Sequence, residues 1–168
     1  EFRRVLFRSE SDFPAKPIRM VAGFAAGGGS DTICRPVAAQ MSAGLGQQVI
    51  VDNRVGAGNS IAAELVVKSA PDGYTILCVN ANHTLNPVVY DNLPYDTERD
   101  LTGVSQISSS SLILIANPAL AANSVKELVA LAKAWPNTLN AGTIGTAGSG
   151  AVTTAMLKLV AGMPFVIV

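Results

Sequence analysis

The chain has 168 residues, of which 49% are hydrophobic and 14% charged, and its formal net charge at pH 7 is zero. This length and composition allow one well-buried core or parts of two. They give no sign of a nucleic-acid groove or an anionic membrane surface as a partner, and no apolar run approaches the roughly 20 residues of a membrane-spanning helix.

The first nine residues, EFRRVLFRS, fit none of the elements that follow. Glu-Phe and Arg-Ser are pairs that common restriction sites encode, so this segment resembles translated vector or adapter DNA. It also lacks the ordered basic start, apolar core and small-residue cleavage site of a secretory signal. We therefore expect residues 1–11 to be a non-native leader outside the fold.

The most informative motif is a glycine-rich loop, GFAAGGGSD, at residues 23–31. It follows a strand predicted over 18–24 and precedes a helix predicted over 32–45, with Pro36 expected near the first turn. Glycine lets a ligand approach the backbone, and the first N–H groups of a helix are free to bind an anion. The spacing matches neither the GxxxxGK[ST] phosphate loop nor GxGxxG, and a simple tight connection remains an alternative. The predicted anion cradle consists of Ala26, Gly27, Gly28, Gly29 and Ser30.

Two further strand–loop steps follow this motif. A second strand is predicted over 48–51 and a helix over 61–69, and a third strand is predicted over 74–79. The β-α-β-α-β alternation indicates a parallel sheet with helices on its faces. Since ligands bind outside the carboxyl ends of parallel strands, the loops after the three strands should converge on one edge. The later two loops add the candidate contacts Gly58, Asn82, His83 and Thr84.

The later half of the chain begins with a connector. Two extended runs, 101–107 and 112–116, are split by four serines, a plausible crossover between two lobes. Ser124 and Glu127 then form a capping box, which predicts a helix that continues to Trp135.

A second glycine-rich loop separates a strand predicted over 139–144 from a helix predicted over 151–160. A cradle in each half suggests a ligand held between two lobes. The candidate contacts of this second cradle are Gly145, Thr146 and Ser149. The chain closes with an apolar run, 163–168, which we expect to be a buried strand. Because bare apolar strands rarely end proteins, we expect the chain to be a fragment.

Two cysteines and one histidine could carry chemistry. Cys34 and Cys78 are 44 residues apart, and we expect buried thiols rather than a disulfide; two cysteines alone make no zinc site. For His83, no catalytic partner can be assigned from the sequence. His83 could take part in catalysis or line the ligand-binding cleft, although a structural role is the default.

Charged residues near the first cradle have competing interpretations. Asp31 would oppose an anionic ligand, so we expect it to cap the N-terminus of the following helix instead. Arg19 and Arg35 could neutralise a ligand, but solvated or structural roles are the default. Arg54 is the stronger electrostatic candidate, because it directly precedes the loop that contains Gly58.

A set of short strings occurs in order along the chain: FPAKPIR (13–19), GGGSD (27–31), LGQ (45–47), NRVGAG (53–58), APDGYT (70–75), LPYD (93–96) and SVKEL (124–128). As a set, these strings resemble the substrate-binding proteins of tripartite tricarboxylate transporters, the Bug family. The resemblance extends over residues 13–168.

The resemblance implies an α/β fold of the type II periplasmic-binding-protein kind, with two lobes of parallel-type sheets flanked by helices and the second half missing. Lobe 1 is expected at 12–108 and lobe 2 at 109–168. It further implies a periplasmic protein, monomeric when full length, that captures a small di- or tricarboxylate for the membrane subunits of a transporter. No catalytic residue, metal, cofactor or nucleic-acid partner is expected.

An alternative function is that of an α/β enzyme acting on a phosphorylated or nucleotide substrate through the same cradle. Such an enzyme needs a convergent cluster of acid, base, nucleophile or metal ligands. The sequence shows no such cluster, so binding is the leading hypothesis.

Overall fold

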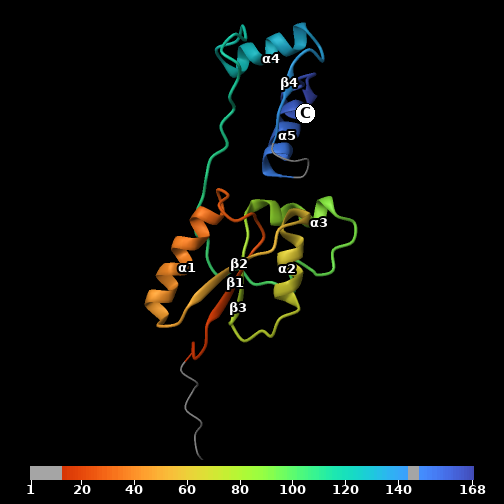
Figure 1. Ribbon diagram of the computed structural model, residues 1–168. Helices are drawn as coiled ribbons and strands as arrows, with labels where there is room; N and C mark the ends of the chain where they lie inside the picture. Colours follow the sequence, from red (N-terminus) through yellow and green to blue (C-terminus); the bar gives the residue numbers. More distant parts are fainter. Residues whose placement is uncertain (1–12, 144–147) are drawn as a thin grey trace, which may run out of the picture. The chain divides into compact units, whose positions relative to one another are not determined.

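The computed structural model describes residues 13–143 and 148–168 (Figure 1). The chain divides into two compact units, with the boundary between Ser108 and Ser109. Each unit contains its own cluster of buried apolar residues. The two units are therefore described separately, as unit 1 and unit 2.

Unit 1 is built on a three-stranded parallel sheet with the strand order β2-β1-β3 (Figure 1). The strands are β1 (Ile18–Ala22), β2 (Val49–Asn53) and β3 (Thr75–Cys78). Ala22 pairs with Asn53 on one side and with Cys78 on the other. All three strands thus end at one edge, as the β-α-β-α-β alternation predicted, although β1 ends two residues earlier than expected.

Helices α1 (Asp31–Leu45) and α2 (Ser60–Val67) lie on opposite faces of this sheet (Figure 1). Apolar residues at helical spacing in α1 meet alternate residues of the strands, which gives a core of Ile18, Met20, Cys34, Ala38, Val49 and Cys78. On the other face, α2 buries Ala62 and Ala63 completely. The small alanine side chains let this helix approach the sheet closely.

Pro36 lies one turn further into α1 than the sequence indicated. The helix begins at Asp31, so Pro36 is its sixth residue and lies inside it rather than in the first turn. A proline there cannot donate to the carbonyl of Thr32. Because Pro36 and Thr32 are both exposed, water can satisfy that carbonyl.

A disulfide joins Cys34 of α1 to Cys78 of β3, so the expectation of two buried thiols is wrong. Spacing along the chain could not show this, because the topology brings the two residues together: β3 pairs with β1, and α1 covers the same face. Their Cα atoms are 6.9 Å apart. In the chain-entropy account, closing a loop of 44 residues stabilises the fold by about 4 kcal/mol.

Short helical turns follow β2 and β3. They are η1 (Ala57–Asn59), η2 (Ala81–Leu85) and α3 (Asn86–Val89), so the loop expected at 80–84 is mostly a 3-10 helix. Residues 101–116 form neither helix nor strand, and nearly all of them are exposed. The runs expected to be extended there therefore pair with no strand among the described residues.

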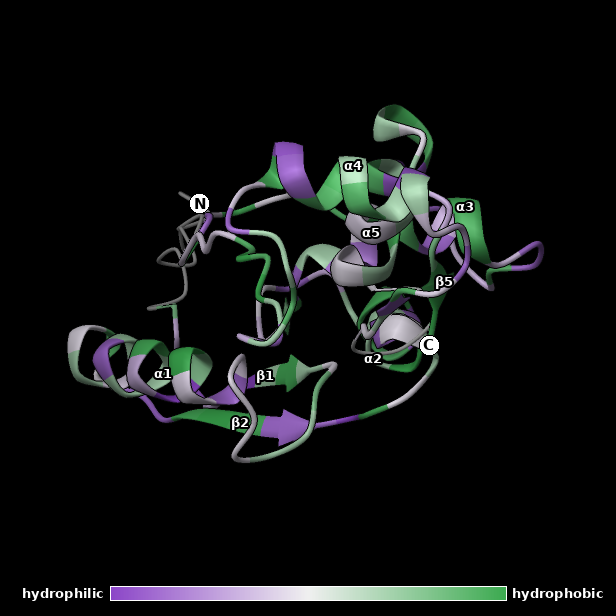
Figure 2. Cartoon of the chain, turned by 90° about the horizontal axis from the view of Figure 1, so that it is seen from above, coloured by the Kyte–Doolittle hydropathy of each residue, from purple (hydrophilic) through white to green (hydrophobic). Residues whose placement is uncertain are grey.

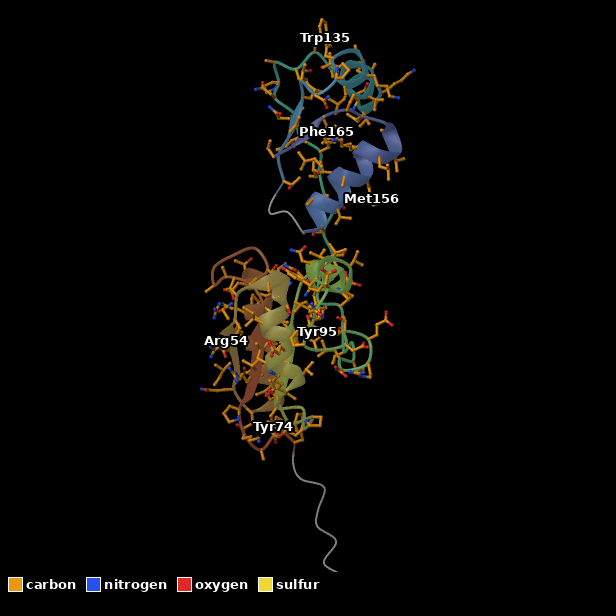
Figure 3. The ribbon with its side chains drawn as sticks, turned by 90° about the vertical axis from the view of Figure 1, so that its right-hand side faces the viewer. Arg54, Tyr74, Tyr95, Trp135, Met156 and Phe165 are labelled. Carbon is orange, nitrogen blue, oxygen red and sulfur yellow. A yellow bond between two sulfur atoms is a disulfide. The ribbon has the colours of Figure 1, made fainter. Side chains whose placement is uncertain are left out.

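Unit 2 contains α4 (Val125–Ala134), β4 (Asn140–Ala141), α5 (Ser149–Ala161) and β5 (Val166–Ile167), and its two strands are parallel. The N-cap predicted at Ser124 is confirmed, because its hydroxyl accepts the N–H of Glu127 at 3.2 Å. The core of the unit consists of Ala132, Met163 and Phe165. At the end of α4, Trp135 extends outward and is 63% exposed (Figure 3).

The apolar run 163–168 is only half buried, which corrects the expectation of a buried strand. Met163 and Phe165 enter the core, whereas Val166, Ile167 and Val168 are exposed. The reason is that β5 has only two residues and, among the described residues, pairs with no strand but β4. Across the described ranges, we find no helix with the length and apolarity to cross a membrane.

Candidate ligand-binding site

The loops that follow the three strands of unit 1 are joined by amide side chains, which confirms their predicted convergence. Asn80, just beyond β3, donates from Nδ2 to the Ser30 hydroxyl in the glycine-rich loop at 3.4 Å. The Oδ1 atom of Asn80 accepts from Nδ2 of Asn59 in η1 at 2.9 Å. At the end of β2, Asn53 donates to the carbonyl of Phe24 at 2.9 Å. This edge is polar, and β2 changes from hydrophobic to hydrophilic as it approaches it (Figure 2).

The glycine-rich loop uses two of its five predicted N–H donors internally. Gly27, at φ 77°, donates to Oδ2 of Asp31 at 2.8 Å, and Gly28 donates to the carbonyl of Ala25 at 3.2 Å. The N–H groups of Ala26, Gly29 and Ser30 have no partner within the described residues. The donors available to a ligand are therefore concentrated directly before α1.

Space around these donors is also open. A Cβ atom built on Gly29 would meet no atom of the described residues within 4 Å, whereas one on Gly28 would lie 3.2 Å from the carbonyl oxygen of Ala25. Gly29 consequently leaves room beside the free N–H groups at the N-terminus of α1, where the helix dipole favours an anion.

Asp31 is a buried carboxylate behind this loop. It lies in the first turn of α1 but accepts from Gly27, Arg35 and Asn53 rather than capping N–H groups of the helix. The hydrogen bond from Arg35, followed by those from Gly27 and Asn53, lowers the pKa of Asp31 to about 2. Its negative charge is thus permanent at neutral pH and is compensated by Arg35, so it opposes a bound anion only weakly.

The arginines named from the sequence all have carboxylate partners. Arg19 and Arg54 both pair with Asp52, whose pKa they lower, and Arg35 pairs with Asp31. Arg54 lies at the surface of unit 1 (Figure 3) and is committed to Asp52 at 3.1 Å, although the sequence made it the strongest candidate. Within the described residues of unit 1, none of these arginines has a free guanidinium group. An anion would therefore meet neutral donors, which are N–H and hydroxyl groups.

Gly58 lies in a turn whose backbone requires glycine. Its φ is 59°, and a Cβ atom there would lie 2.7 Å from Oδ1 of Asn86. Asn86 is buried and donates from Nδ2 to the carbonyl of Gly58 at 3.0 Å. These contacts show that Gly58 is needed for the conformation of the turn, whether or not it also contacts a ligand.

The other candidates of unit 1 lie on η2. His83 is 6% exposed and stacks on Tyr95 with ring centroids 5.9 Å apart. Its Nδ1 atom is buried without a hydrogen-bond partner among the described residues, and burial lowers the pKa of the imidazole, so the neutral form is favoured. Asn82 is half-buried, and Thr84 is exposed and donates its hydroxyl to the carbonyl of Ala81.

The candidates of unit 2 are described only in part. Ser149 is the first residue of α5, follows the N-cap Gly148 and is half-buried. Gly145 and Thr146 lie outside the described residues. The predicted second cradle is therefore represented in the structure by the start of α5.

A cavity of about 740 Å³ lies along the connector after α3. Tyr90 and Tyr95 contribute to its lining, and its charged groups include the ion pair Arg99–Asp100. None of the candidate contacts lines it, so we do not assign the ligand there. Within the described ranges, no group of three or more His, Cys, Asp or Glu residues is arranged to hold a metal ion.

Sequence reasoning missed the residues that hold the loops together. Asn53, Asn59 and Asn80 connect the three loops, and the disulfide lies beneath them. One available signal was the position of Asn53 and Asn80 at the ends of apolar strands. Asn59 adopts φ 76°, a conformation that asparagine tolerates better than most residues.

Comparison with known proteins gives a consistent result. The family model described as "Tripartite tricarboxylate transporter family receptor" matches residues 33–168. A UPF0065 protein of Bordetella pertussis is 37% identical over 147 residues, which are 87% of this chain and 45% of that protein. The chain spans less than half the length of the curated relatives that it matches.

Two solved structures are similar to the chain in fold. R. palustris Rpa4515 with adipate gives a TM-score of 0.73 at 30% identity, over 93% of this chain and 52% of that chain. MatC from Rhodopseudomonas palustris with bound malate gives a TM-score of 0.71 at 26% identity, over 93% and 53%. These similarities agree with an α/β fold of the periplasmic-binding-protein type.

Proposed function

The chain belongs to the receptor family of tripartite tricarboxylate transporters, and on this premise we propose that it is part of a solute-binding protein for a small carboxylate. The observation that carries the proposal is the pair of N–H groups at Gly29 and Ser30, which have no partner among the described residues and lie beside the polar edge where three loops converge. A carboxylate is the ligand whose charge and acceptor oxygens match such donors at the N-terminus of a helix.

The neighbouring structures support this ligand class. They contain adipate and malate, both dicarboxylates. In the present chain, the pairing of Asp31 with Arg35 leaves the first cradle close to neutral, so main-chain donors and the Ser30 hydroxyl would compensate the ligand. The N–H groups of Gly27 and Gly28 already have partners. These two glycines would therefore donate no hydrogen bond to the ligand, but their lack of a side chain would leave room for it.

The remaining candidates complete the proposed set of contacts. In unit 1 they are Ala26, Gly58, Asn82, His83 and Thr84, and in the later part of the chain Gly145, Thr146 and Ser149. Asn82 and Thr84 would add polar side-chain contacts from η2.

We also propose delivery of the bound carboxylate to membrane subunits of a tripartite transporter, in the periplasm and without chemical conversion. Support for the partner comes from the family. Support for the compartment comes from the Cys34–Cys78 disulfide, because structural disulfides form in oxidising compartments. The enzyme alternative lacks support, since His83 stacks on Tyr95 and no carboxylate partner is seen for it among the described residues.

Calorimetric titration tests the proposal. Adipate and malate should bind, whereas adipamide, the neutral diamide of adipate, should not, because it lacks the charge. Gly29→Val should abolish binding by filling the open space beside the donors, and Gly44→Ala near the far end of α1 should leave it unchanged. Equal binding of the diamide, or unaltered affinity in Gly29→Val, would exclude this site.

A separate incubation with nucleotides and flavins tests the enzyme alternative. We expect no retained chromophore and no turnover. A specific turnover that disappears in His83→Ala would favour the enzyme over the binding protein.

A further inference from the structure

Two links of different kinds tie the glycine-rich loop and the start of α1 to the end of β3 and the segment that follows it. One is the disulfide between Cys34 and Cys78, and the other is the hydrogen bond from Asn80 to Ser30. We propose that these four residues form a loop clamp that positions the donors for the carboxylate, so that loss of the disulfide weakens binding. The inference rests on the proposed function and adds positioning residues to its site.

The covalent link lies directly beneath the two loops. Cys34 is in the first turn of α1, and its N–H donates to the carbonyl of Ser30 at 3.0 Å. Cys78 is the last residue of β3 and lies two residues before Asn80. Helix α1 packs mainly over β1 and β2, so the disulfide is its covalent tie to β3. It fixes the N-terminus of α1 relative to the start of η2.

The hydrogen-bonded link depends on both ends of one amide. Nδ2 of Asn80 donates to Ser30, while Oδ1 accepts from Asn59 at 2.9 Å and from the N–H of Asn82 at 3.2 Å. An aspartate would keep the acceptor and lose the donor, and an alanine would lose both. Asn80 thereby sets the positions of three loops with one side chain.

Neutral donors bind a carboxylate well only when they converge on it, because each is weaker than a charged group. Convergence requires the positions of Gly29 and Ser30 to be fixed relative to η2, since these elements lie about fifty residues apart in sequence. The loop clamp supplies this constraint before the ligand arrives, which lowers the ordering cost of binding.

Reduction of the disulfide would open the covalent half of the loop clamp. A dithiol breaks the S–S bond, Cys34 and Cys78 each gain one hydrogen, and the dithiol becomes a disulfide, so two electrons are transferred. Cys34 is completely buried and Cys78 is 9% exposed. The bond is therefore protected in the folded protein, which suits a permanent positioning role.

The first experiment establishes the bond. The unfolded protein should take up no thiol-alkylating reagent without reductant and two equivalents after treatment with a dithiol. Uptake of two equivalents without reductant would overturn the inference.

The second experiment measures loop order without ligand. In Cys34→Ala/Cys78→Ala, NMR order parameters of Gly29 and Ser30 should fall from about 0.85 to below about 0.6, at a temperature at which the sheet remains folded. Val49→Ala, which weakens the same core at the amino end of β2, should leave them unchanged. Loops that stay rigid without the disulfide would overturn the inference, whatever the protein binds.

Variants of Asn80 test the other half of the loop clamp and retain the disulfide, so they remain informative if the double variant does not fold. Asn80→Ala should mobilise both Ser30 and Asn82. Asn80→Asp should restore order at Asn82 but not at Ser30, a separation that general destabilisation would not produce. Equal order in all three proteins would contradict the assignment.

Binding of adipate separates the inference from the proposed function. The double variant should lose at least tenfold in affinity, and Val49→Ala less than twofold. If the oxidised protein binds no carboxylate while the loops still loosen, the proposed function fails and the loop clamp stands. If adipate binds equally well with and without the disulfide, the positioning role is wrong and the proposed function stands.

Discussion

The N–H of Gly27 donates to the carboxylate of Asp31, four residues further along the chain, at 2.8 Å. This bond closes the glycine-rich loop in front of α1 around an internal anion. Arg35 and Asn53 complete the surroundings of the same carboxylate. Asp31 consequently organises the loop from behind, while the N–H groups of Gly29 and Ser30 have no partner in the part of the chain that the structure describes.

Replacing Asp31 by asparagine should remove part of the acid sensitivity of the protein. The pKa of Asp31 is about 2 in the fold against an ordinary value of 3.8. Its stabilisation is therefore complete above about pH 4 and is lost as the pH falls through about 2. Urea midpoints measured over this range should fall more steeply in the wild type than in Asp31→Asn. Parallel curves would show that Asp31 does not carry this dependence.

Two glycine-to-alanine substitutions should have opposite effects on stability. Gly44 lies inside α1, and an added methyl group there would meet none of the described residues within 4 Å, so Gly44→Ala should raise the free energy of unfolding by about 0.5–1 kcal/mol. Gly58 has φ 59° and lies against Asn86, so Gly58→Ala should destabilise the protein. Thermal unfolding compares them, and a gain in stability at Gly58 would contradict the structure.

His83 should contribute a pH dependence near neutrality. Burial lowers its pKa below the ordinary 6.5, so the unfolded chain takes up the proton more readily. Wild-type stability should therefore fall as the pH drops below about 6.5, and this component should be absent in His83→Gln. The difference between urea midpoints of the two proteins, followed from neutral to mildly acidic pH, measures it. A difference that stays constant would argue against a buried neutral imidazole.

Phe165 should be central to the stability of unit 2. It is 3% exposed and packs with Met163 and Ala132, so Phe165→Ala should cost about 3–5 kcal/mol. Val168→Ala is the matched control, because Val168 is 69% exposed and its truncation should change stability by less than about 0.5 kcal/mol. Hydrogen exchange of α4 and α5 amides reports on this unit directly. Equal exchange in the two variants would contradict the assigned core.

Local patterns in the sequence were sufficient to predict most of the secondary structure. Apolar runs located β1, β2 and β3, and Gly46 at φ 68° ends α1 as a C-terminal glycine should. The capping box was also informative at Ser124, although Glu127 reaches back to the N–H of Asn123 rather than that of Ser124. These features depend on neighbours within a few residues, which a sequence displays directly.

Contacts between distant residues could not be predicted in the same way. The disulfide joins residues on different elements. Asp52 pairs with both Arg19 and Arg54. Arg54, which precedes a glycine-containing loop, was therefore mistaken for an unpaired charge. The internal use of the Gly27 and Gly28 donors was equally hidden. In each case the folded structure determines which residue is the partner, and the spacing of residues along the sequence does not indicate it.

The most direct test of carboxylate binding at the first cradle is an NMR titration of the ¹⁵N-labelled chain with adipate. We expect saturable shifts of the amide signals of Gly29 and Ser30, with none at Gly73, which lies just before β3 at the opposite end of the sheet. Adipamide at the same concentrations should cause no shifts. Amide signals of Gly29 and Ser30 that remain unmoved at millimolar adipate, or that respond equally to adipamide, would show that the first cradle is not a carboxylate site.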